Sequence, residues 1–279
     1  MPSVHSIAQK GFGTGTNELY DRIRPSYQPF SLDYIRESLK QTEPLNIVEI
    51  GAGTGIFTRA LLKDPKWNAL IKELKALEPS EGMRDVFTRT VPKDDRISIA
   101  EGYFDATKVE DGWADLIVIA QAFHWCPDYD AAALEFARIL KPTGTVALIW
   151  NLEDRDGAEW VAKIRDLIEV HEQGTPQFRH GYWKQTFDTP SYQKFFEPPQ
   201  QKTWSYHITG TKESAVDRAS SKSFIAVLPD EKKKEVQNEI RKIVDEDTSK
   251  VWIDKSQGTF EYPYKVDVVI CHKSDSSCT

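Results

Sequence analysis

Residues 45–55, LNIVEIGAGTG, constrain the fold of this chain more than any other segment. The first six of them form a short apolar, β-branched run, typical of a strand buried on both faces of a sheet. Glycines follow at positions 51, 53 and 55, and residues 56–62 then have the composition and apolar face of a helix. A buried strand, a glycine turn and a helix predict an open parallel α/β sheet with a ligand seat at the end of its first strand.

Two details of this turn indicate which ligand it binds. A dinucleotide fingerprint has the form G-x-G-x-x-G, but Ile56 occupies the third glycine position. Glu49 lies at the end of the strand, where a carboxylate would repel a pyrophosphate and attract an ammonium group. Together these features predict a zwitterion attached to a nucleoside, the description of S-adenosylmethionine.

A second predicted strand, residues 74–77, ends at Glu78 and Pro79. Glu78 lies 23 residues after Gly55, near the spacing at which open α/β sheets place an acid on the ribose hydroxyls. Considered without the glycine turn, Glu78 has an alternative interpretation as a solvated residue at the end of a strand. Residues 81–90 follow as an amphipathic helix that includes Met83.

The third and fourth predicted strands, residues 96–100 and 113–120, also end in candidate site residues. Asp105 is expected to accept a hydrogen bond from an adenine amino group while Phe104 offers its backbone amide, unless Asp105 is a solvated loop residue. Residues 121–125, QAFHW, should face the reactive end of the cofactor. His124 is a candidate base, although a His before a Trp in an apolar stretch is more often packed and structural.

The flanking regions frame this core, and we expect one domain over residues 1–279. Residues 1–40 form an N-terminal arm, either packed by its aromatics or closing as a lid with Arg24 facing the ligand carboxylate. Residues 41–152 form the cofactor-binding core. Residues 153–201 are an aromatic-rich insertion, either a substrate cap or packing against the sheet edge. Residues 202–279 supply the remaining strands and a helix, with the last strand antiparallel.

Composition excludes several classes of function. A net charge of −7 argues against non-specific binding to nucleic acid or to anionic membranes, and no stretch approaches the length of a membrane helix. The three cysteines share no convincing metal-ligand spacing with one another or with histidine, so no metal is expected. We therefore expect a cytoplasmic monomer or homodimer with a small-molecule partner.

The segments NIVEIGAGTG, ALEPSEGM, AQAFHW and ILKPTGTVALIW resemble motifs of the class I S-adenosylmethionine-dependent methyltransferases, closest to the trans-aconitate and ubiquinone-type group (methyltransferase type 11). The resemblance implies a Rossmann-like, doubly wound, seven-stranded sheet and methyl transfer to a small organic acceptor. The longer connection at residues 64–71 and the sequence of residues 102–105 depart from the family pattern.

From the residues and this resemblance together we predict three groups of site residues. The cofactor contacts are Tyr20, Arg24, Glu49, Gly51, Gly53, Thr54, Gly55, Glu78, Pro79, Met83, Phe104, Asp105, Gln121 and Ala122. The acceptor contacts are His124, Trp125 and Trp150. Carboxylate and thiolate acceptors need no base, whereas a hydroxyl or an amine would need His124 or Tyr20. A non-catalytic S-adenosylmethionine-binding subunit and a nucleotide-dependent oxidoreductase remain as alternatives.

Overall fold

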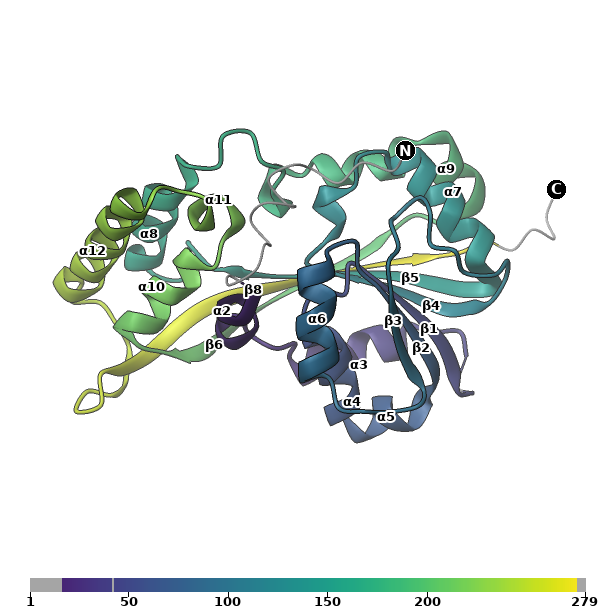
Figure 1. Ribbon diagram of the computed structural model, residues 1–279, viewed down its shortest axis with the longest axis horizontal. Helices are drawn as coiled ribbons and strands as arrows, with labels where there is room; N and C mark the ends of the chain where they lie inside the picture. Colours follow the sequence, from purple (N-terminus) through teal and green to yellow (C-terminus); the bar gives the residue numbers. More distant parts are fainter. Residues whose placement is uncertain (1–16, 42, 275–279) are drawn as a thin grey trace.

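The computed structural model describes residues 17–41 and 43–274 and is built on one mixed sheet (Figure 1). The strand order is β3-β2-β1-β4-β5-β8-β6, and a short strand, β7, pairs with β8. Neighbours from β3 to β5 are parallel, and β8 lies antiparallel between β5 and β6. The strands are β1 Leu45–Ile50, β2 Ile71–Leu77, β3 Ile97–Ala100, β4 Ala114–Ala120, β5 Leu140–Glu153, β6 Gln200–Gly210, β7 Trp252–Asp254 and β8 Thr259–His272.

The predicted fold class is confirmed, with one correction to the strand number. The described residues form eight strands rather than seven, because β7 adds a short hairpin arm to β8. The most apolar predicted strands, β1 and β4, are buried at every residue and pair with each other in the middle of the sheet. β3 lies at the edge of the sheet and is only partly buried, which explains its weaker apolar signal.

Helices cover both faces of the sheet and extend beyond one end of it. In Figure 1, α7 and α9 lie over one face, while α8, α10 and α12 gather beside the long strands β6 and β8 as a helical lobe. The α-helices are α2 Asn17–Ile23, α3 Pro29–Glu37, α4 Ile56–Lys63, α5 Pro65–Leu70, α6 Glu81–Thr90, α7 Tyr129–Ile139, α8 Glu159–Glu169, α9 Pro190–Phe195, α10 Lys212–Ser220, α11 Ser223–Ala226 and α12 Asp230–Glu246. None of the helices in the described part of the chain is long and apolar enough to cross a membrane.

Several helix ends differ from the sequence-based expectation for local reasons. In the arm, α3 begins at Pro29, and the Ser31 hydroxyl donates to the Gln28 carbonyl at 2.7 Å. Asp128 caps α7, since its carboxylate accepts hydrogen bonds from the backbone N–H groups of Asp130 and Ala131. The longer connection at residues 64–71 contains the short helix α5. Helices α10 and α11 were not predicted.

The aromatic insertion packs on the sheet and also reaches the site. Trp183, Tyr192 and Phe196 are buried in one core cluster with residues of α7, as the packing interpretation expected. The short 3-10 helices η2 (Phe178–His180) and η3 (Tyr182–Asp188) complete this layer. Phe178 stacks on Trp150 with ring centroids 4.6 Å apart and also lines a cavity described below. The structure thus shows the packing role, while the role as a substrate cap stays a prediction.

Candidate functional site

The glycine turn at the end of β1 combines tight packing with one open face. Gly51 and Gly53 have positive φ angles of +74° and +56°. A Cβ atom on Gly51 would lie 2.5 Å from the Ala122 Cβ, so the exit of β4 leaves no room for a side chain there. A Cβ on Gly53 would meet no atom of the described residues within 4 Å. The backbone of Gly53 is therefore exposed to space in which a ligand can approach it closely.

Glu49 presents a buried carboxylate oxygen beside this turn. Its Oε2 accepts from the Thr58 hydroxyl at 2.5 Å, whereas Oε1 has no hydrogen-bond partner among the residues that the structure describes. Burial raises the pKa of Glu49 to about 8, against the smaller opposing effects of Thr58 and Arg59. A buried acceptor without a donor is unfavourable, and an ammonium group would supply the missing donor.

Glu78 connects the end of β2 to the glycine turn. Its Oε2 accepts from the Gly53 N–H and its Oε1 from the Ser80 N–H, each at 2.9 Å. Burial raises the pKa of this carboxyl group, and the two backbone donors oppose the rise. The side chain is fixed next to the open face of Gly53, the position predicted for a ribose contact. Pro79 follows it, and Met83 is buried on the first turn of α6.

The remaining predicted cofactor residues lie on neighbouring loops. The Thr54 hydroxyl is buried and lacks a hydrogen-bond partner among the described residues. Phe104 and Asp105 lie in a tight turn closed by a bridge between Tyr103 and Ala106. The Phe104 ring packs edge-on against Phe123 at 5.8 Å, while Asp105 is half-buried.

Gln121 lies between the glycine turn and an adjacent cavity. It adopts a φ of +60°, a conformation uncommon outside glycine and often found at functional sites. Its side-chain amide donates to the Asn151 carbonyl at 2.7 Å. The next residue, Ala122, contacts the glycine turn as described above.

The cavity has about 620 Å³ of space unfilled by protein atoms, including the open solvent at its mouth. Residues from six segments line it: Tyr20, Arg24, Gln121, His124, Trp125, Asn151, Leu152, Arg165, Gln177, Phe178, Arg179, Arg218, Lys222, Ser223 and Phe224. Five predicted site residues are among them. The glycine turn, Glu49 and Glu78 do not line this cavity, so the predicted residues fall into two adjacent groups.

His124 is held as a neutral ring. Its Nδ1 accepts from the Trp150 indole N–H at 3.3 Å, and this bond assigns the remaining proton to Nε2. Burial, followed by the charges of Arg24, His180 and Lys222, lowers the pKa of His124 to about 3. Nε2 is therefore a hydrogen-bond donor, and Nδ1 already uses its lone pair.

Trp150 was predicted to contact the acceptor, but the structure places it elsewhere. It is fully buried between Phe178 and Trp183, each with its ring centroid 4.6 Å away, and it does not line the cavity. Its indole N–H reaches the cavity only through His124. The β5 strand continues past Trp150, and it is Asn151 and Leu152 that line the cavity.

A buried basic cluster on the cavity wall was missed by the sequence analysis. Glu153 pairs with Arg165 at 3.0 Å, Arg218 at 2.9 Å and Lys222 at 3.0 Å. Although burial alone would raise it, the pKa of Glu153 is held well below its usual range by Arg218, Lys222 and Arg165. Charged residues in amphipathic helices resemble a solvated face in sequence, so no local signal marked α10 and α11 as part of the site.

Comparison with known proteins identifies the family. The methyltransferase domain family matches residues 48–148. An uncharacterized methyltransferase-like protein of Schizosaccharomyces pombe is 31% identical over 241 residues, which cover 86% of this chain and 88% of that protein. The chain belongs to the class I S-adenosylmethionine-dependent methyltransferases. An uncharacterized methyltransferase of Mycobacterium bovis is 25% identical over 225 residues, covering 81% of this methyltransferase and 82% of its relative.

Solved structures show the same fold. The YcgJ protein of Bacillus subtilis superposes with a TM-score of 0.55 at 16% identity and covers 88% of this methyltransferase and 99% of its own chain. A phosphoethanolamine N-methyltransferase 2 of Haemonchus contortus, in complex with phosphomonomethylethanolamine and S-adenosylhomocysteine, gives a TM-score of 0.55 at 14% identity. That alignment covers 98% of this chain and 61% of the other.

Proposed function

We propose that this methyltransferase transfers a methyl group to an oxygen, sulfur or nitrogen atom of a small organic molecule, most readily a carboxylate or hydroxyl oxygen. The trans-aconitate and ubiquinone-type group is the subgroup that we propose for it. The observation that carries the proposal is the unpartnered buried oxygen of Glu49, beside a glycine turn with one open face. This arrangement fits the amino group and nucleoside of S-adenosylmethionine.

The residues present can hold each part of this cofactor. Glu49 would bind the ammonium, Glu78 the ribose hydroxyls, and the turn at Phe104 and Asp105 the adenine. Arg24 would bind the methionine carboxylate, because its buried Nε has no hydrogen-bond partner among the described residues. Its guanidinium is already held over the Tyr20 ring at 4.5 Å and by the Ser221 carbonyl at 3.1 Å.

Little further chemistry is required of the chain. When bound, S-adenosylmethionine supplies a methyl group that its sulfonium already activates. The cavity residues need only hold the acceptor atom in line, and orientation of this kind can supply ~7–11 kcal/mol of a reaction barrier. We propose that His124 donates from Nε2 to the acceptor. A hydroxyl acceptor would need a base, for which Tyr20 on the cavity wall is the candidate.

Two measurements test this function. The first is calorimetric binding of S-adenosylhomocysteine to the wild-type protein. The second is transfer of a labelled methyl group from S-adenosylmethionine to a panel of acids, phenols, thiols and amines. Binding together with transfer to a panel member supports the proposal. Binding without transfer to any member favours a non-catalytic subunit, and absence of binding rejects the cofactor assignment.

A further inference from the structure

The wall of the acceptor cavity holds buried hydrogen-bond donors without acceptors. The Nη1 atom of Arg218 and the Nδ2 atom of Asn151 have no partner among the residues that the structure describes. Both side chains are almost completely buried, at 2% and 3% exposure. Each unsatisfied donor is costly in a buried position, and more so when it is charged. Both residues line the cavity, and a ligand that brings acceptor atoms would satisfy their donors.

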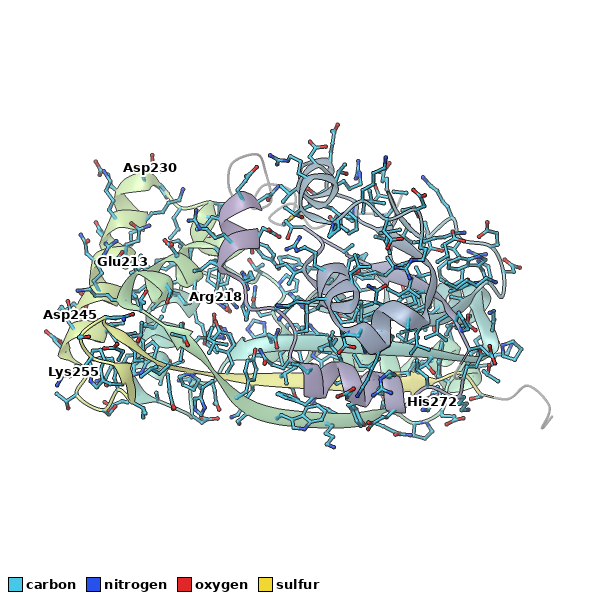
Figure 2. The ribbon with its side chains drawn as sticks, turned by 90° about the horizontal axis from the view of Figure 1, so that it is seen from below. Glu213, Arg218, Asp230, Asp245, Lys255 and His272 are labelled. Carbon is cyan, nitrogen blue, oxygen red and sulfur yellow. The ribbon has the colours of Figure 1, made fainter. Side chains whose placement is uncertain are left out.

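Both side chains are already fixed from the other side. The Nε atom of Arg218 donates to the Tyr264 hydroxyl and pairs with Glu153, each at 2.9 Å. The Oδ1 atom of Asn151 accepts from the Tyr206 hydroxyl at 3.1 Å. Figure 2 shows Arg218 on the inner side of the helical lobe, whereas Glu213 of the same helix lies toward its outer end. The free donor atoms are therefore held in place before any ligand binds, which lowers the ordering cost of binding.

The charges around the cavity are also unbalanced. Five cationic side chains line it, namely Arg24, Arg165, Arg179, Arg218 and Lys222. Three carboxylates pair with them, namely Glu153, Glu169 and Glu172. Burial, followed by the charges of Arg218, Arg165 and Arg24, lowers the pKa of Lys222 well below its usual range, against the opposing effect of Glu153. A buried charge without a partner is strongly unfavourable, so the cavity favours an anionic occupant.

We propose that the methyl acceptor is an organic anion whose carboxylate or phosphate group binds Arg218 Nη1 and Asn151 Nδ2. Its apolar part packs on Phe178 and Phe224, which line the same cavity. The proposal rests on the proposed function, because that function assigns the cavity to the acceptor.

The substitution Asn151→Asp tests the charge argument without any ligand. It keeps the size of the side chain and the acceptor for Tyr206, and it places a negative charge where Nδ2 now lies. If the cluster lacks one anion, the melting temperature should rise by about 2 °C or more. Asn238→Asp is the matched control, because Asn238 is exposed on α12 and also contacts an arginine, Arg241. An Asn151→Asp variant that melts at or below the wild-type temperature overturns the proposal.

Three aromatic probes test the ligand chemistry by calorimetry with S-adenosylhomocysteine present. Phenylacetate should bind at least tenfold more tightly than its neutral isostere phenylacetamide, and Asn151→Asp should remove this preference while Asn238→Asp keeps it. Phenyl phosphate distinguishes a phosphate from a carboxylate site by binding more tightly than phenylacetate. If S-adenosylhomocysteine binds but neither anion exceeds phenylacetamide, the anion site is wrong and the cofactor site stands. If S-adenosylhomocysteine itself does not bind, the proposed function fails first.

Discussion

The two halves of the candidate site have opposite electrostatic character. The half at the ends of β1 and β2 presents buried carboxyl groups, and Glu49 has an acceptor oxygen for which the described residues supply no donor. The half formed by β5, η2, α10 and α11 presents buried basic side chains, and Arg218 has a donor that meets no acceptor in the described part of the chain. Since unsatisfied atoms mark what a site still lacks, the first half fits a cationic group and the second an anionic one. Under the proposed assignment, the cofactor site and the acceptor site therefore differ in charge.

The largest effect should come from filling the open face of the carboxylate half. Gly53→Val should lower the affinity for S-adenosylhomocysteine by more than about a hundredfold, because the side chain would occupy ligand space and strain a left-handed backbone. Gly258→Val is the control, since Gly258 has a φ of +67° and an equally open Cβ direction in the β7–β8 hairpin. Calorimetry that finds equal affinities for the two variants would remove the glycine turn from the site.

Glu78→Ala tests the ribose contact of the same half. Removing this carboxylate should weaken the binding of S-adenosylhomocysteine by roughly 1.5–3 kcal/mol, the range for hydrogen bonds to a charged group. Glu81→Ala, on the exposed first turn of α6, should leave the affinity unchanged. A loss of less than about threefold for Glu78→Ala would show that the ribose lies elsewhere.

The raised pKa of Glu49 predicts a pH dependence of binding. Below its pKa of about 8 the carboxyl group is protonated and must lose the proton to pair with an ammonium. The affinity for S-adenosylhomocysteine should therefore rise between pH 6 and 7.5, by up to about tenfold per pH unit. Glu49→Gln should bind more weakly and show a flat profile over that range. A wild-type profile that is equally flat would disconnect Glu49 from the ligand.

The raised pKa of Glu49 affects the stability of the folded protein in the opposite direction, because stability falls as the pH rises. A folded-state pKa above the unfolded value means that the stabilising contribution of Glu49 is complete below about pH 4.5 and is lost as the pH rises through about 8. Glu49→Gln should therefore melt at a higher temperature than the wild type at pH 9 and at a similar temperature at pH 4.5. A variant that is less stable than the wild type at pH 9 would contradict the raised pKa.

The smallest effect is expected at His124, which lines the cavity of the basic half. Because its Nδ1 accepts from Trp150 and its pKa lies near 3, the wild-type rate should show no inflection between pH 6 and 7. His124→Asn should lower the single-turnover rate by less than about tenfold. A loss of about a hundredfold or more, with normal binding and melting, would instead assign general-base catalysis to His124.

The two halves also differ in how far the sequence predicts them. β1, α6 and the positions of Gly53 and Glu78 at strand ends follow from local patterns, because a buried strand, a glycine turn and a strand-end acid each have a signature within a few residues. The bounds of β1 and α6 match the prediction.

The basic half has no such signature. Glu153, Arg218 and Lys222 are brought together only by the packing of α10 and α11 against the end of β5, and their charges resemble solvent-exposed positions in sequence. The left-handed backbone of Gln121 is likewise set by its surroundings, since nothing in a glutamine predicts it. Trp150 was misplaced because the stack formed by Phe178 and Trp183 comes from a segment without regular periodicity.

The most direct test of the contrast between the halves is a crystal structure with S-adenosylhomocysteine and phenylacetate bound together. We expect the amino group of the homocysteine within hydrogen-bond distance of Glu49 and the ribose hydroxyls on Glu78. The carboxylate of phenylacetate should lie on Arg218 and Asn151. A structure in which the homocysteine carboxylate occupies the Arg218 cluster, or in which phenylacetate lies outside the cavity, would contradict the division of the site by charge.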